Sequence, residues 1–281
     1  MKRVGVVGLM LALLASTGLM PMAGLSETDS IDHSYADFGE LLRQHVVGAR
    51  VDYAALRMNR EDLDSIVETF GTVTELEFDG WSRERQIAYL INAYNAFTLQ
   101  AVIDHYPIDG GWFSFLRWAP RNSIRQIGGV WTERRWSAAG AELTLDELEH
   151  ERIRAPYGEA RIHFAINCAA ISCPPLRRAP YVGERLDRQL IVAARDYLAS
   201  PEGLQIEGET IRASSVFDWF GEDFIEEYSH LVDAPGSDRD RAVLGVVAKY
   251  GPAEASQLAQ SGNARLRFLS YDWELNDLER R

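Results

Sequence analysis

The sequence predicts an α+β fold: a single helix-rich domain with a small, mainly antiparallel sheet. Segments with the periodicity of a helix outnumber segments with the alternation of a strand. The two kinds do not follow one another in regular strand–helix–strand order, which argues against a parallel α/β sheet. Hydrophobic residues make up 46% of the 281 residues and charged residues 25%, a balance typical of globular proteins rather than disordered chains.

The N-terminal segment is predicted to lie outside this domain. Lys2 and Arg3 precede an apolar run over residues 4–14, and small residues follow. This order is that of a secretory signal peptide over residues 1–24, and the run is short for a membrane span. We therefore expect a periplasmic or secreted protein with no stable membrane insertion after signal cleavage. An uncleaved anchor is the alternative.

The rest of the chain is predicted to be one domain preceded by a short arm. Residues 25–35 are mostly polar and are predicted to be flexible, and residues 36–281 carry closely spaced elements without a low-complexity linker. The net charge is −13, so binding to nucleic-acid phosphates is not expected. The expected partner is a small-molecule or peptide substrate of neutral or cationic character.

Three helices are predicted in the first half of the chain, over residues 36–46, 60–70 and 82–105. The third has apolar residues at helical spacing and further apolar residues on its other faces. It should therefore be a central, buried helix. Ser82 is its expected N-cap, and Pro107 ends it.

Two asparagines of this helix are predicted to share one of its faces. Asn92 and Asn95 are three residues apart, which is the spacing of neighbours on a helix surface. Buried amides need hydrogen-bond partners, so these side chains either bridge neighbouring loops or line a polar cavity. In a polar cavity they would be able to stabilise an oxyanion.

The stretch over residues 107–140 is predicted to consist of loops and short strands. It holds four of the seven tryptophans, Trp112, Trp118, Trp131 and Trp136. Such clustering is typical of anchoring in the core, and a platform for a ligand is the alternative. A helix should then begin at Thr144, because Glu147 three residues later completes a capping box.

The segment over residues 161–168 alternates cleanly and is predicted to be a strand. This alternation places Cys168 on the face opposite to His163. The later elements are predicted to be a helix over residues 184–198, a hairpin turning near residues 207–208, two or three helices between residues 215 and 260, and a strand over residues 265–269.

Cys168 is the candidate nucleophile, because it ends the predicted strand and enters a loop of small residues. A catalytic thiol needs a base to form its thiolate and a third group to orient that base. His163 is close in sequence but is predicted to face away. His150 is the preferred base, because its helix can pack with its active end against the end of the strand.

The acid that would orient His150 is left open by the sequence. Glu149 is adjacent to it, but consecutive residues of a helix do not face each other. Glu142 and Asp146 are the alternatives, and Asp146 lies one turn before His150 on the same helix face.

Two other interpretations compete with catalysis. In an exported protein, Cys168 and Cys173 would be able to form a disulfide within a non-catalytic envelope module that binds its partner through the tryptophan-rich residues 112–136. The two cysteines, with His150 and His163, also have the donor types that zinc prefers, but the cysteine spacing is unlike that of the usual pairs. We therefore expect no metal and no cofactor.

Several segments together resemble the domain-of-unknown-function 547 (DUF547) family, across residues 36–275. The segments that carry the resemblance are 51–53, 89–96 (YLINAYNA), 145–150 (LDELEH), 162–168 (IHFAINC), 174–177, 217–220, 223–224 and 271–273. Several such segments in the right order make the resemblance specific.

The resemblance implies that Asn92, Asn95, Glu149, His150 and Cys168 belong to the site. Plant members of the family carry serine at the position of Cys173, which speaks against an obligatory disulfide. A papain-like or transglutaminase-like fold is the analogy for such a Cys/His domain. We therefore expect a thiol-dependent hydrolase or acyl transferase in which His150 takes and returns the proton, and the binding module is the alternative.

Overall fold

The computed structural model describes residues 30–111 and 119–279. The predicted signal peptide, Trp112 and Trp118 lie outside these residues. The fold is helix-rich, as predicted, with 53% helix and 10% strand. None of the described helices is long and apolar enough to cross a membrane.

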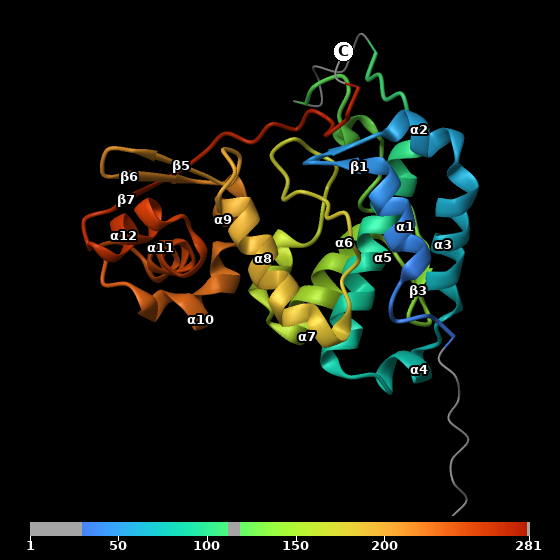
Figure 1. The fold of residues 1–281 in the computed structure, drawn as a ribbon, viewed down its shortest axis with the longest axis horizontal. Coiled ribbons are helices and arrows are strands. Elements are labelled where there is room, and N and C mark those ends of the chain that lie inside the picture. The colour runs from blue at the N-terminus through green and yellow to red at the C-terminus, as the bar shows by residue number, and fades with distance from the viewer. Residues whose placement is uncertain (1–29, 112–118, 280–281) are drawn as a thin grey trace, which may run out of the picture.

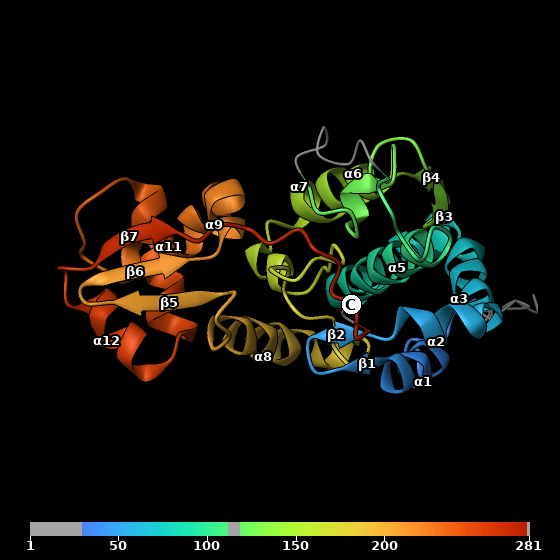
Figure 2. The ribbon, with the colours of Figure 1, turned by 90° about the horizontal axis from the view of Figure 1, so that it is seen from above.

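Two hydrophobic clusters organise the fold, and Figure 2 shows them towards opposite ends of an elongated molecule. The helices of the first cluster are α1 (Ala36–His45), α2 (Tyr53–Met58), α3 (Arg60–Thr72), α4 (Glu75–Asp79) and α5 (Arg83–Ile103) (Figure 1). The helices of the second cluster are α9 (Ser215–Phe220), α10 (Ile225–Tyr228), α11 (Asp238–Tyr250) and α12 (Ala253–Gln260), and α8 (Leu186–Leu198) packs in the first cluster with its beginning and in the second with its end. These helices confirm the ones predicted from residues 36, 60, 82 and 184 onward, whereas residues 215–260 form four α-helices in place of the two or three predicted.

The strands form small sheets, and most of their pairings are antiparallel, as predicted. Two antiparallel pairs are β1 (Val46–Val47) with β2 (Arg50–Val51), and β3 (Trp136–Ala138) with β4 (Ala141–Leu143). The third sheet joins β5 (Leu204–Glu207) to β6 (Thr210–Ala213) in the predicted hairpin, and β7 (Arg265–Phe268) adds to β6 in parallel. These sheets do not establish a papain-like or transglutaminase-like fold.

Helix α5 is the centre of the first cluster, as predicted. The hydroxyl of Ser82 accepts a hydrogen bond from the backbone N–H of Arg85 and so caps the helix. Every residue from 87 to 99 is buried, which explains why the apolar residues of this helix are not confined to one face.

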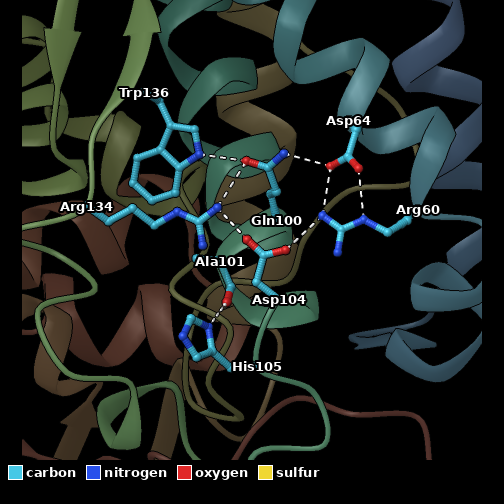
Figure 3. Close-up of polar contacts among 8 residues, drawn as sticks. All are labelled: Arg60, Asp64, Gln100, Ala101, Asp104, His105, Arg134 and Trp136. Atoms are coloured by element: carbon cyan, nitrogen blue, oxygen red, sulfur yellow. Dashed lines mark hydrogen bonds and ion pairs between the residues drawn. The ribbon is translucent and has the colours of Figure 1, made fainter.

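A polar network ties the end of α5 to α3 and β3 (Figure 3). The carboxylate of Asp104 accepts from Arg60 at 2.9 Å and pairs with Arg134 at 2.5 Å. The side-chain oxygen of Gln100 accepts the indole N–H of Trp136 at 2.8 Å. The network therefore fixes the position of α5 relative to two neighbouring elements.

The predicted strand over residues 161–168 is wrong. This segment is a 3-10 helix, η4 (Ala160–Phe164), followed by irregular chain. Phe164 packs in the second hydrophobic cluster, whereas Ile162 and Ile166 pack in the first. The apolar alternation of this segment therefore does not come from a strand. It arises because the segment runs between two hydrophobic clusters and places side chains in both.

The predicted helix at Thr144 begins with the expected capping box, in which Glu147 takes part. After one turn, α6 (Leu145–Glu147), the winding widens to a π-helical segment, η3 (Leu148–Arg154), and the helix ends with α7 (Ala155–Tyr157). π-Helical turns are rare and are frequent at functional sites.

The C-terminal tail, residues 269–279, runs from the second cluster back to the first (Figure 2). Its Leu275 is buried in the first cluster. The backbone N–H of Asn276 donates to the carbonyl of Ala169 at 3.0 Å. The tail therefore lies beside the loop that carries Cys168.

Candidate active site

A pocket of about 380 Å³ lies where α5, η3, α9, the Cys168 loop and the C-terminal tail meet. Three of the predicted site residues line it, Cys168, His150 and Glu149, and Asp146 and His163 line it as well. These side chains come from distant parts of the sequence, and the fold brings them to one place.

Asn92 and Asn95 are buried in α5 and hold loops in place. The amide of Asn92 donates to the carbonyl of Tyr181 at 2.8 Å and accepts from its N–H at 2.9 Å. Asn95 donates to the carbonyl of Ala165 at 3.0 Å and accepts from the N–H of Asn167 at 2.8 Å. The structure therefore gives both asparagines the first of the two predicted roles, bridging, and neither is among the described residues that line the pocket.

The loop around Cys168 makes a sharp turn that Asn167 holds in place. The side chain of Asn167 accepts from the N–H of Ala169 at 2.9 Å and donates to the carbonyl of Pro174 at 2.7 Å. Ala169 has a φ of 61°, which is uncommon for a residue other than glycine. Such conformations cluster at functional sites, where surrounding contacts hold them.

Cys168 and Cys173 are free thiols whose Sγ atoms lie 2.8 Å apart, and no disulfide joins them in the structure. The two thiols share a hydrogen bond, the Cys173 sulfur also accepts from the backbone N–H of Cys168 at 2.9 Å, and the hydroxyl of Tyr271 lies 3.1 Å from the Cys168 sulfur. The hydrogen bond with Cys173, and then that with Tyr271, hold the pKa of Cys168 below its ordinary value although burial opposes them. Burial raises the pKa of Cys173, so Cys168 is the one of the two thiols that ionises first.

Glu149 and His150 leave η3 in different directions, as expected of consecutive residues. Glu149 accepts a hydrogen bond from the hydroxyl of Tyr94 at 3.2 Å. Nε2 of His150 lies 3.4 Å from an oxygen of Asp146, and its Nδ1 lies 2.7 Å from Nη1 of Arg154. The acid beside the imidazole is therefore Asp146, the geometric alternative to Glu149.

The prediction that His163 faces away from Cys168 is wrong, because it rests on the absent strand, and both residues line the pocket. Nε2 of His163 lies 2.7 Å from Oδ2 of Asp223, and its ring stacks on Phe220. Arg154 donates to both oxygens of Asp223, at 2.8 and 2.9 Å. Burial acts to raise the pKa of Asp223, but the hydrogen bonds from His163 and Arg154 outweigh it and hold this pKa well below 3.8.

One side of the pocket is an aromatic wall made of Trp131, Trp219, Tyr271 and Trp273. The rings of Trp219 and Trp273 stack with centroids 5.7 Å apart, and Tyr271 lies 4.7 Å from the first and 4.6 Å from the second. Trp219 is 45% exposed, so part of this wall faces solvent. The segments that hold Trp219, Tyr271 and Trp273 carry the predicted resemblance, but the sequence did not place them at the site, since α9 and the tail reach it only through the tertiary fold.

Within residues 30–111 and 119–279, no group of three or more His, Cys, Asp or Glu side chains is arranged to hold a metal ion. A zinc site built on His150 and His163 would need their ring nitrogens. One ring nitrogen of His150 already contacts Arg154, and one ring nitrogen of His163 already contacts Asp223.

Comparison with known families gives a match over residues 78–198, to the family described as "Protein of unknown function, DUF547". The chain carries a DUF547 domain. The matched region is narrower than the predicted resemblance over residues 36–275. No curated protein and no solved structure matches the chain.

The DUF547 match and the pocket do not coincide. Cys168, His150 and His163 lie within the matched residues, whereas Asp223 and Tyr271 lie beyond them. The pocket beside the DUF547 nucleophile candidate is therefore completed by the C-terminal part of the chain. Both residues lie in segments that carry the predicted resemblance, 223–224 and 271–273, but the sequence assigned neither of them to the site, because each contact with the site is made only in the folded chain.

Proposed function

We propose that this protein is a thiol-dependent hydrolase or acyl transferase and that Cys168 is its nucleophile. The observation that carries the proposal is the environment of the Cys168 sulfur, which is hydrogen-bonded to Cys173 and to Tyr271 while the residue lines the pocket. The thiolate is the reactive form of cysteine, and thiols with lowered pKa values in partly exposed surroundings are typical of catalytic sites.

In the proposed reaction the thiolate attacks the carbonyl carbon of an amide, ester or thioester. The C–S bond forms, and the carbonyl becomes a tetrahedral oxyanion that the hydroxyl of Tyr271, 3.1 Å from the sulfur, supports as a donor. The oxyanion then collapses, the bond to the leaving group breaks, and the leaving group takes a proton. Water or another acceptor attacks the resulting thioester and releases Cys168.

The proton transfers call for an imidazole, and the pocket contains His150 and His163. Glu149 also lines the pocket, where its carboxylate accepts a hydrogen bond from the hydroxyl of Tyr94. The reaction is proposed to take place outside the cytoplasm, because the N-terminal residues have the order of a signal peptide.

A thiol-directed acyl probe tests the proposal. The wild type should be labelled, and Cys168→Ala should lose the label while its far-ultraviolet circular dichroism stays that of the wild type. Cys173→Ala is the matched control: it also removes a sulfur but keeps Cys168, so it should still be labelled, more slowly. Equal labelling of the wild type and Cys168→Ala would refute the proposal.

The aromatic wall favours a second candidate function, a binding module without catalysis. Exposed aromatic surface beside a pocket is typical of a site that receives a flat apolar or sugar face. A module of this kind should bind its ligand equally well after Cys168→Ala and should lose binding after Trp219→Ala. Tryptophan fluorescence titrations with short peptides and oligosaccharides measure this. Binding that depends on Trp219, without acyl labelling, would favour the module.

A further inference from the structure

We infer that His163, oriented by Asp223, is the acid–base residue of the proposed thiol reaction, and that His150 is not. This inference rests on the proposed function. Both imidazoles line the pocket with Cys168. The choice between them therefore depends on which ring has a nitrogen that can take a proton.

Both ring nitrogens of His150 are engaged. Nη1 of Arg154 lies 2.7 Å from Nδ1, and because a guanidinium can only donate, Nδ1 must be the acceptor. The ring then carries its proton on Nε2, which lies 3.4 Å from the carboxylate of Asp146. His150 cannot accept another proton unless Arg154 first moves away.

His163 has a carboxylate partner that orients its ring. Its Nε2 lies 2.7 Å from Oδ2 of Asp223, and an ionised carboxylate can only accept, so Nε2 carries the proton and Nδ1 the lone pair. The ring of Phe220 stacks on the imidazole with centroids 4.3 Å apart and fixes its plane. The side chain is 1% exposed, so bulk water does not compete for the contact with Asp223.

Arg154 connects the two histidines and is a positioning residue. Its Nε and Nη2 donate to the two oxygens of Asp223, which holds the carboxylate in the orientation that His163 needs. Its Nη1 occupies the nitrogen of His150 that would otherwise take a proton. Arg154 therefore orients His163 through Asp223 and occupies the nitrogen at which His150 would accept a proton.

p-Nitrophenyl acetate separates the two chemical steps. Attack by Cys168 forms the C–S bond, breaks the ester C–O bond and releases p-nitrophenolate, which needs no proton from the enzyme and is seen as a burst. In the second step water attacks the thioester, a base takes the proton of the water, and the Cys168 thiolate leaves. Only this second step requires His163.

His163→Gln should keep the burst and lower steady-state turnover by about 100-fold or more, the usual contribution of a general base. His150→Gln keeps an amide oxygen for Arg154 and should lower turnover by less than about tenfold. His230→Gln changes an exposed histidine outside the pocket, on η7 (Ser229–Leu231), and is the matched control that should behave as the wild type. A larger loss of turnover in His150→Gln than in His163→Gln would overturn the inference.

Asp223→Asn keeps the inference testable if His163→Gln fails to fold, as judged by circular dichroism. The asparagine amide offers an N–H as well as an oxygen to the imidazole, which favours the wrong tautomer. This variant should keep the burst and lose turnover, and normal turnover would contradict the inference. A wild type without a burst, or a burst that persists in Cys168→Ala, would instead refute the proposed function, and the inference with it.

Discussion

Among single residues, the two cysteines show how burial divides the roles of identical groups. Burial raises the pKa of Cys173, whereas the hydrogen bond between the two side chains lowers the pKa of Cys168. The structure therefore gives Cys173 an effect on its neighbour that does not depend on a disulfide. A serine hydroxyl at this position would also be able to form the hydrogen bond.

Cys173→Ala should raise the pKa of Cys168, because the hydrogen bond with Cys173 is the largest cause that lowers it. The rate of alkylation by iodoacetamide follows the thiolate, so its midpoint in a pH series should move to higher pH. Cys173→Ser keeps a donor and should move the midpoint less. An unchanged midpoint in Cys173→Ala would contradict the role given to the pair, with Cys168→Ala as the background.

Asp223→Asn should make the free energy of unfolding depend less on pH at acidic pH. The pKa of Asp223 lies below its ordinary value of 3.8 in the folded protein, so the unfolded chain binds more protons in this range. Above pH 3.8 the ionised carboxylate stabilises the folded protein. This stabilisation is lost as the pH falls from there through the pKa of Asp223 in the folded protein. Urea unfolding should show the gap between wild type and variant narrowing below about pH 4. A gap that stays constant would disprove this.

At the scale of elements, local signals predicted the positions of helices better than the partners they pack against. Ser82 and Thr144 mark helix starts through hydrogen bonds to nearby backbone, and such contacts are written in adjacent residues. The alternation in residues 161–168 instead reflects two cores, which no short window of sequence distinguishes from one core and solvent. The face assigned to His163 failed with that strand.

The polar network at the end of α5 should contribute modestly to stability. Asp104→Asn keeps the shape of the side chain but removes the charge shared by Arg60 and Arg134. These groups are partly exposed, so we expect the free energy of unfolding to fall by only about 1 kcal/mol. Glu68→Gln, an exposed change on α3, the helix that carries Arg60, is the control and should have almost no effect. Equal losses in the two variants would show that the network adds nothing.

For the whole molecule, the long-range contacts decide what the sequence reveals of the site. The sequence singles out Cys168, His150 and Glu149 because they lie in recognisable segments, and the fold brings all three to the pocket. Asp223 and Tyr271 act through contacts 60 and 103 residues away in the chain, with His163 and Cys168 respectively. Patterns within a segment carry no information about such pairs.

At the scale of the whole chain, we expect residues 1–24 to be removed as a signal peptide. Expressed with its own N-terminus in a host that secretes proteins, the mature chain should begin after residue 24, because the residues before it have the order of a signal peptide. N-terminal sequencing of the protein recovered outside the cytoplasm measures this. A chain that still starts at Met1 and stays in the cytoplasm would contradict it.

The C-terminal tail sets when the thiol site becomes complete during synthesis. Cys168 leaves the ribosome about a hundred residues before its partner Tyr271, the pair being 103 residues apart. A growing chain therefore has Cys168 but lacks one of the two side chains that lower the pKa of its thiol, so the low pKa waits for a nearly finished protein. A fragment cut at residues 78 and 198 would remain permanently in this unfinished state, with Cys168 present and both Tyr271 and Asp223 missing.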